Sequence, residues 1–212
     1  DAGVEDLVAP RSRGTTRAAC VAAALWPDRV SGLVSVNGYL IQDIAGSEKP
    51  LRPDLEAGFW YFYYFLTERG RAGLTAYRRA VAEVIWRRNS PAWAFSDAQL
   101  DLAASAFVNP DYVDVVLHSY RHRLGQAPGA EAYADLEDRL SRLPRIGVPT
   151  ITLDGLADGN FPATDGGAYA EHFTGPWRHH RVENAGHNLP QEAPEAFVNA
   201  VVEVAGMGNL LS

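Results

Sequence analysis

This sequence of 212 residues contains a single cysteine, Cys20. An internal disulfide is therefore excluded. Cys20 lies in the alanine-rich helical run TTRAACVAAALW, where a buried packing thiol is a better interpretation than a nucleophile. A reducing compartment is compatible with this cysteine usage.

The sequence also lacks long apolar runs and clusters of basic residues. No window approaches the roughly 20 apolar residues of a membrane-spanning helix, and the first residues lack the charged-then-apolar pattern of a signal peptide. The formal net charge is -7 and the basic residues are scattered, whereas a nucleic-acid partner calls for a clustered basic face. We therefore expect a cytoplasmic protein that binds a small-molecule substrate, with no nucleic-acid and no membrane partner.

The two outer parts of the sequence alternate apolar runs with helical patterns. Four β-branched or apolar runs predict strands, at residues 4–9, 31–38, 148–155 and 179–186. A helical pattern that Pro27 ends lies between the first two runs, and an amphipathic helix over residues 191–206 follows the last one. This order is typical of an α/β fold, a parallel sheet with helical crossovers.

The middle of the sequence has no convincing strand and is rich in aromatic residues and arginine. Helices are predicted over residues 55–89, with a break near Gly70, and over residues 97–107. A last helix of this region is predicted to end near residue 124 and to be capped by Asn109, just before Pro110.

These two kinds of pattern predict an insertion. We interpret residues 41–144 as an all-helical cap inserted between sheet strands, and residues 1–40 and 145–212 as the α/β core. Helical lids over the carboxyl ends of parallel strands cover the place where such sheets bind ligands.

One histidine lies where it could act as a catalytic base. His187, in the segment RVENAGHNLPQEAPEAF, follows a predicted strand end, and imidazole suits proton transfer near neutral pH, although a lone loop histidine is more often simply solvated. Asp158, in LDGLADG, lies just past the end of another predicted strand and could orient the imidazole and stabilise its charged form. We rank Asp158 ahead of Asp154, which still belongs to the strand, and of Asp165, which lies well into the following loop.

Three segments together resemble a known family. GLAD as an acid loop, AGHNLPQEAPEAF as a histidine loop and ALWPDRVSGLVSVNG after a nucleophile helix are similar to α/β-hydrolases of the epoxide hydrolase and haloalkane dehalogenase group. The resemblance extends from about Thr16 onward. It implies a partial α/β-hydrolase fold with a helical cap, a catalytic triad that includes His187 and Asp158, and no cofactor.

The resemblance also implies roles for two tyrosines. Epoxide hydrolases place two cap tyrosines over the nucleophile, and their hydroxyls assist ring opening. FWYFYYF and HSYRHR resemble the segments that carry them, which puts the two tyrosines at Tyr61 and Tyr120. Phenol donors would stabilise the alkoxide charge of an opening epoxide. With nine tyrosines, eight phenylalanines and five tryptophans in the chain, packing alone is the other interpretation of these rings.

The nucleophile is where the sequence departs from the family. The epoxide hydrolase pattern normally reads like Gly-His-Asp-Trp-Gly, but the corresponding stretch here is LVAPRSRGTTRAAC, with Arg13 where the aspartate is expected. A guanidinium cannot attack an epoxide. A register shift of one residue puts Ser12 at the centre of a degraded Gly-x-Ser-x-Gly pattern, which would instead indicate a serine esterase.

Four hypotheses about function therefore remain. The first is an epoxide hydrolase-like enzyme, impaired if the nucleophile is missing; the second is a serine esterase that uses Ser12. The third is a non-catalytic remnant that binds small ligands, and haloalkane dehalogenase is a weak fourth, since no halide-binding tryptophan can be placed. We also expect a truncated or divergent family member, whose strand at residues 4–9 would be an unprotected edge open to self-association.

Metal sites are not indicated by the histidine pairs. His179 and His180 are adjacent, so on a strand they point to opposite faces, and His118 and His122 have helical spacing but no evident third ligand. We expect no metal at either pair.

Overall fold

The sheet is parallel and has three strands in the part of the chain that the computed structural model describes, residues 13–208. Its order is β1 (Leu33–Val36), β2 (Thr150–Gly155) and β3 (Trp177–Val182). These strands confirm three of the four predicted ones, and they belong to an α/β fold. The run at residues 4–9 lies outside the described residues, so the self-association proposed through it stays a prediction.

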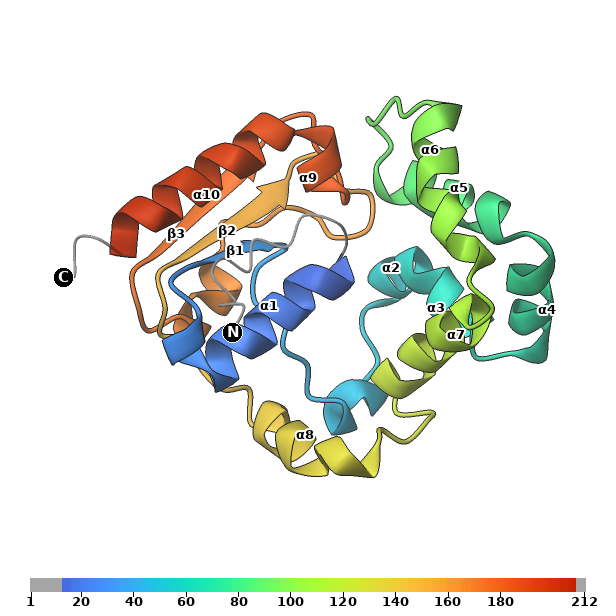
Figure 1. Ribbon diagram of the computed structural model, residues 1–212, viewed down its shortest axis with the longest axis horizontal. Coiled ribbons are helices and arrows are strands. Elements are labelled where there is room, and N and C mark those ends of the chain that lie inside the picture. Colours follow the sequence, from blue (N-terminus) through green and yellow to red (C-terminus); the bar gives the residue numbers. More distant parts are fainter. Residues whose placement is uncertain (1–12, 209–212) are drawn as a thin grey trace.

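Helices cover both faces of this sheet, as Figure 1 shows. Helix α1 (Arg13–Leu25) packs on one face and α10 (Pro194–Gly208) on the other. Side chains alternate between the two faces along each strand, so the sheet separates two hydrophobic cores. Leu33 packs with residues of α1 in one core, and Ile151 and Leu153 pack with residues of α10 in the other. As predicted, α1 ends just before Pro27, where a short 3-10 turn η1 (Pro27–Arg29) begins.

Cys20 is part of the core beneath α1. Its side chain is fully buried, and its sulfur lies 3.4 Å from the hydroxyl of Ser35 on β1. Burial raises the pKa of the thiol, which disfavours the reactive thiolate. The prediction of a packing thiol is thus confirmed.

All described elements between β1 and β2 are helical. Most of them, between residues 57 and 124, form a separate layer beside the sheet (Figure 1), with a core of aromatic and aliphatic side chains such as Phe65, Leu74 and Leu117, whereas Leu140 packs against the core beneath α1. Along the chain these elements are η2 (Ala45–Glu48), α2 (Pro53–Glu56), η3 (Ala57–Phe59), α3 (Trp60–Tyr64), α4 (Glu68–Ala76), α5 (Arg78–Asn89), α6 (Asp97–Ala104), η4 (Ser105–Val108), α7 (Tyr112–Arg123), η5 (Glu131–Tyr133) and α8 (Ala134–Ser141). After β2 come η6 (Gly167–His172) and α9 (Leu189–Glu192). Within the described residues, every helix falls short of the length and apolarity that crossing a bilayer requires.

Gly70 does not break a helix, contrary to the prediction. It lies inside α4. The helical run is interrupted before α4, where Thr67 caps the helix by accepting from the N–H of Gly70 at 2.9 Å, and again after α4, at Tyr77. The glycine serves a close approach instead, since a Cβ there would lie 1.8 Å from the carbonyl oxygen of Tyr64. α3 and α4 can therefore pack only with glycine at this position.

This contact predicts an unusual effect of Gly70→Ala. In an ordinary helix interior the change stabilises by roughly 0.5–1 kcal/mol. Here the methyl group meets backbone that cannot rotate away, so we expect a net loss of about 1–3 kcal/mol in the free energy of unfolding. Urea unfolding measures it, with Gly206→Ala in α10 as the control, because a Cβ at Gly206 meets nothing within 4 Å. Equal effects of the two changes would contradict this account.

Two further helix boundaries differ from the prediction. Asn109 does not cap α7; its side chain accepts from the N–H of Asp111, a turn that precedes the helix. The closing helix is divided into α9 and α10, because Pro194 begins a new helix after Ala193.

Candidate active site

The carboxyl ends of the three strands lie at one edge of the sheet, and the loops that follow them carry the polar residues singled out above. Asp158 lies in the loop after β2, and His187 lies in the loop after β3. Because β2 and β3 are parallel neighbours, their loops leave the sheet side by side. Residues far apart in the sequence can therefore meet here.

His187 and Asp158 are hydrogen-bonded. The distance from His187 Nδ1 to Asp158 Oδ2 is 2.8 Å, and the exposed fractions of the two side chains are 9% and 0%. An ionised carboxylate only accepts, so Nδ1 carries the proton and Nε2 is the basic nitrogen. The imidazole also stacks on the ring of Phe161, with centroids 5.7 Å apart. The arrangement fixes both the tautomer and the plane of the ring.

Asp158 is held as a carboxylate by several donors. Its Oδ1 accepts from the N–H groups of Asn160 and Phe161, each at 2.8 Å, and its Oδ2 also accepts from Asn37 Nδ2 at 3.1 Å. Burial raises the pKa of Asp158, but the hydrogen bond and charge of His187, together with the two backbone donors, outweigh it and bring that pKa below its ordinary value. Asp158 is therefore ionised near neutral pH.

Asp154 and Asp165, the competing carboxylates, have other partners. Asp154 is buried on β2, the central strand, and accepts from the N–H and hydroxyl of Thr164 at 3.0 and 3.2 Å. Asp165 is exposed and accepts from the N–H of Gly167. The geometry thus pairs His187 with Asp158, although the catalytic role of the pair stays a prediction.

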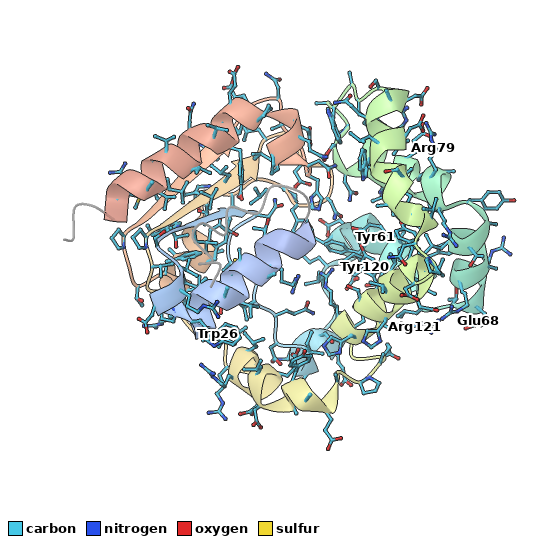
Figure 2. All side chains as sticks on the ribbon, viewed as in Figure 1. Trp26, Tyr61, Glu68, Arg79, Tyr120 and Arg121 are labelled. Carbon is cyan, nitrogen blue, oxygen red and sulfur yellow. The ribbon has the colours of Figure 1, made fainter. Side chains whose placement is uncertain are left out.

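The two predicted tyrosines meet as well. Tyr61 lies on α3 and Tyr120 on α7, and their rings pack edge to face with centroids 5.6 Å apart. Figure 2 labels both on the side of the helical layer that faces the sheet. Tyr61 is buried, and its hydroxyl accepts from Asn160 Nδ2 at 3.4 Å, which links it to the loop of Asp158.

A cavity of about 370 Å³ joins these groups. His187 lines it from the sheet side, and the two tyrosines line it from α3 and α7. Its remaining wall mixes apolar side chains with polar ones: Val36, Phe62, Ile85, Trp86, Val115, Val116 and Pro190 on the one hand, and Thr16, Asn89, Ser119, Arg123, Asn188 and Gln191 on the other. A volume of this size suits a small apolar ligand with one or two polar atoms.

Arg123 is a wall residue that the sequence analysis did not single out. Its guanidinium lies over the rings of Phe62 and Tyr120, 4.9 and 5.7 Å from their centroids. Burial lowers the pKa of Arg123, but an arginine remains charged across the physiological range. The cation–π contacts offset part of the desolvation of the Arg123 guanidinium and hold Tyr120 in the cavity wall.

Asn37 and Asn160 are further polar residues that the sequence analysis missed. Asn37 has a left-handed backbone, with φ 65°, directly after β1, and its amide reaches Asp158. An Asn-Gly pair after a strand was a usable signal, since asparagine tolerates this conformation and the carboxyl edge of the sheet is where its side chain would lie.

The sequence predicts the nucleophile near the start of α1, at position 13 or, in the esterase alternative, at Ser12. Ser12 lies outside the described residues. Arg13 is the first residue of α1, where the strand-to-helix turn of this fold would place a nucleophile, and only its backbone is described.

The histidine pairs are engaged in other contacts. On β3, His179 Nδ1 lies 3.0 Å from Thr152 Oγ1, whereas His180 Nε2 lies 2.9 Å from Glu203 on α10, so the two rings point to opposite faces as predicted. Between residues 13 and 208 no group of three or more histidine, cysteine, aspartate or glutamate side chains is arranged to hold a metal ion.

The chain is similar to several solved structures of α/β-hydrolases. A protein of Klebsiella pneumoniae, provisionally named an epoxide hydrolase, is 46% identical with a TM-score of 0.87, over 90% of this chain and 63% of that one. The epoxide hydrolase CorEH is 15% identical with a TM-score of 0.71, over 90% and 64%. A provisionally named α/β-hydrolase of Nostoc is 19% identical with a TM-score of 0.67, over 89% and 62%.

These similarities confirm the fold that the motifs implied. The two more distant structures support the fold alone, while the Klebsiella protein extends the likeness to sequence. The chain spans 63% of the length of that relative. No protein-family model and no curated protein matches the chain.

Proposed function

We propose that this chain, which carries part of an α/β-hydrolase fold of the epoxide hydrolase kind, binds small apolar epoxides in its cavity and keeps the base that would activate water for hydrolysis of an ester intermediate. The observation that carries the proposal is the buried His187–Asp158 pair, whose histidine lines the same cavity as Tyr61 and Tyr120. We further propose that residues 41–144 act as the cap over this cavity.

The proposed reaction has two steps. A carboxylate oxygen attacks an epoxide carbon and breaks the carbon–oxygen bond, which gives an ester and an alkoxide that takes a proton from Tyr61 or Tyr120. His187 Nε2 then removes a proton from water, and the hydroxide attacks the ester carbonyl. Asp158 stabilises the imidazolium that forms. Collapse of the tetrahedral intermediate restores the carboxylate and releases the diol, whose leaving oxygen takes the hydroxyl proton of the intermediate; the imidazolium proton then returns to the tyrosinate through solvent.

The residue at position 13 decides whether the first step can occur. The attacking carboxylate is expected where Arg13 stands, and arginine cannot supply the electron pair. For the chain with Arg13 we therefore expect ligand binding in the cavity with little or no epoxide turnover. The alternative of a serine esterase requires that the hydroxyl of Ser12 reach His187 Nε2.

Two substrates and one variant test these alternatives. Hydrolysis of styrene oxide and of p-nitrophenyl acetate is measured for the purified chain and for His187→Ala. Epoxide turnover that the variant loses would mean that another nucleophile serves the site. Ester cleavage alone, with labelling of Ser12 by an organophosphonate, would favour the esterase. If neither is cleaved, equilibrium binding of styrene oxide decides between an incomplete hydrolase site and no site at all.

The tyrosines give a separate prediction. In a chain that turns over styrene oxide, Tyr120→Phe removes one phenol donor and should lower kcat about 10- to 100-fold, with a smaller change in KM. Tyr61→Phe should have a similar effect. Tyr64→Phe is the matched control, because Tyr64 belongs to the same aromatic cluster but does not line the cavity. Equal losses in Tyr64→Phe and Tyr120→Phe would show that packing, and not proton donation, explains the effect.

A further inference from the structure

The end of helix α5 touches both loops of the candidate site. The carbonyl oxygen of Asn89, the last residue of α5, accepts from the N–H of Gly159 at 3.0 Å and from the N–H of His187 at 3.3 Å. The last carbonyls of a helix have no partner within the helix and carry partial negative charge, so they accept such donors readily. A single atom of the helical insertion therefore bridges the loop of Asp158 and the loop of His187.

Ser90, the next residue, extends this contact. Its side chain is fully buried, and its hydroxyl donates to Glu192 Oε1 at 2.6 Å and accepts from Asn188 Nδ2 at 3.0 Å. Glu192, at the end of α9, also accepts from the N–H groups of Gly186 and Asn188 at 2.7 and 2.8 Å. The amides on both sides of His187 are thus held by one carboxylate.

The approach of α5 is close enough to require glycine in both loops. A Cβ at Gly186 would lie 2.8 Å from Ser90 Cα, and a Cβ at Gly159 would lie 2.2 Å from the carbonyl oxygen of Arg88. Backbone cannot move aside as a flexible side chain can. The two glycines therefore allow the helical insertion to dock directly on both loops.

We propose that Asn89, Ser90 and Glu192 form a clasp that positions His187 against Asp158, and that the helical insertion thereby sets the orientation of the base. This inference rests on the proposed function, because it assigns positioning residues to the same site. Three successive backbone N–H groups, at positions 186, 187 and 188, are fixed by the clasp. The imidazole direction follows from that backbone.

The clasp also connects the base to the ligand. Ile85 and Trp86 line the cavity from α5, within one turn of Asn89, and His187 lines the same cavity. A ligand that packs against α5 therefore contacts the helix whose end holds the histidine loop. Orientation of the base is coupled to occupation of the cavity through one rigid element.

Two variants test the clasp. Ser90→Ala removes the hydroxyl, and Glu192→Gln keeps the side-chain shape while it replaces one acceptor oxygen by a donor, which opposes the N–H groups that Glu192 accepts. Amide hydrogen exchange at positions 186, 187 and 188 should become at least about tenfold faster in each variant. The carbon-13 signal of the Asp158 carboxyl should titrate closer to its ordinary range, because the hydrogen bond from His187 weakens. In a chain that hydrolyses styrene oxide, kcat should fall about tenfold with KM within twofold.

The matched control is Ser96→Ala. Ser96 caps α6 in an exposed capping box, and its capping hydrogen bonds go to Gln99 and not to the clasp, so its loss costs stability without removing a clasp contact. Faster exchange at 186–188 and a changed Asp158 titration in the control would overturn the proposal, as would unchanged values in both clasp variants. If styrene oxide is not turned over by any variant, the exchange and titration results still decide for or against the clasp, and only the proposed function fails.

Discussion

Replacement of Arg13 by aspartate is expected to convert a chain that only binds styrene oxide into one that opens it. The change restores a carboxylate at the position from which the resemblance expects the attack, at the first residue of α1. Attack on the epoxide then gives an ester that His187-activated water hydrolyses to the diol. The expected readout is diol formation by Arg13→Asp and none by the chain with arginine.

A double variant isolates the second step. In Arg13→Asp combined with His187→Ala, the ester should form but its hydrolysis should slow by a factor of about 10²–10⁴, the usual contribution of a general base. Intact-mass spectrometry should then detect the protein with the added mass of one epoxide. Arg11→Asp is the control, because it makes the same charge change two residues away. An adduct in the control, or no adduct and no diol in Arg13→Asp, would rule out position 13 as the source of the nucleophile.

The second large effect is expected for Asp158→Asn. In asparagine an NH2 group replaces one of the two carboxylate oxygens. This NH2 group then faces at least one group that donates to Asp158, the N–H of His187 or the amide of Asn37, and two donors cannot bond to each other. An unsatisfied donor in a fully buried place costs stability, and we expect the free energy of unfolding to fall by about 3 kcal/mol at pH 7. Turnover in the Arg13→Asp background should fall by about 10⁴, because the imidazole loses both its tautomer and its charge partner.

The stability difference should depend on pH in one direction. The pKa of Asp158 is below its ordinary value in the folded chain, while in the unfolded chain it is about 3.9. Below that value the unfolded chain binds a proton that the folded carboxylate still excludes, so the contribution of Asp158 is complete above about pH 4 and is lost as the pH falls through the folded pKa. Urea unfolding of the unchanged chain and of Asp158→Asn between pH 7 and pH 3 measures how far their free energies of unfolding converge.

Asp165→Asn serves as the control for this effect. Asp165 lies in the same loop, is exposed and makes one hydrogen bond to the backbone. Its replacement should change the free energy of unfolding by less than about 0.5 kcal/mol at any pH in this range. A stability difference for Asp158→Asn that stays constant down to pH 3 would contradict the assignment of its lowered pKa.

The position of the candidate pair could be predicted from the sequence because it depends on local pattern. Alternation and β-branched runs mark β2 and β3, and polar residues directly after parallel strands meet at one edge of the sheet. Asp158 and His187 are such residues. Tyr61 and Tyr120 came from the resemblance, since aromatic content alone does not distinguish them from the other rings of the cluster.

The sequence by itself determined the types of the described strands and helices, the helical character of the chain between β1 and β2, and the two loops that carry Asp158 and His187. Only the tertiary structure decided which distant groups support them. Ser90 and Glu192 are 102 residues apart and Asn37 and Asp158 are 121 apart, and no periodicity relates such positions. For the same reason the sequence wrongly predicted a helix break near Gly70. The close approach of α3 that requires a glycine there is set by packing between helices. Local propensity acts over a few residues, whereas these contacts exist only once the helices between β1 and β2 have packed on one another and on the loops of the sheet.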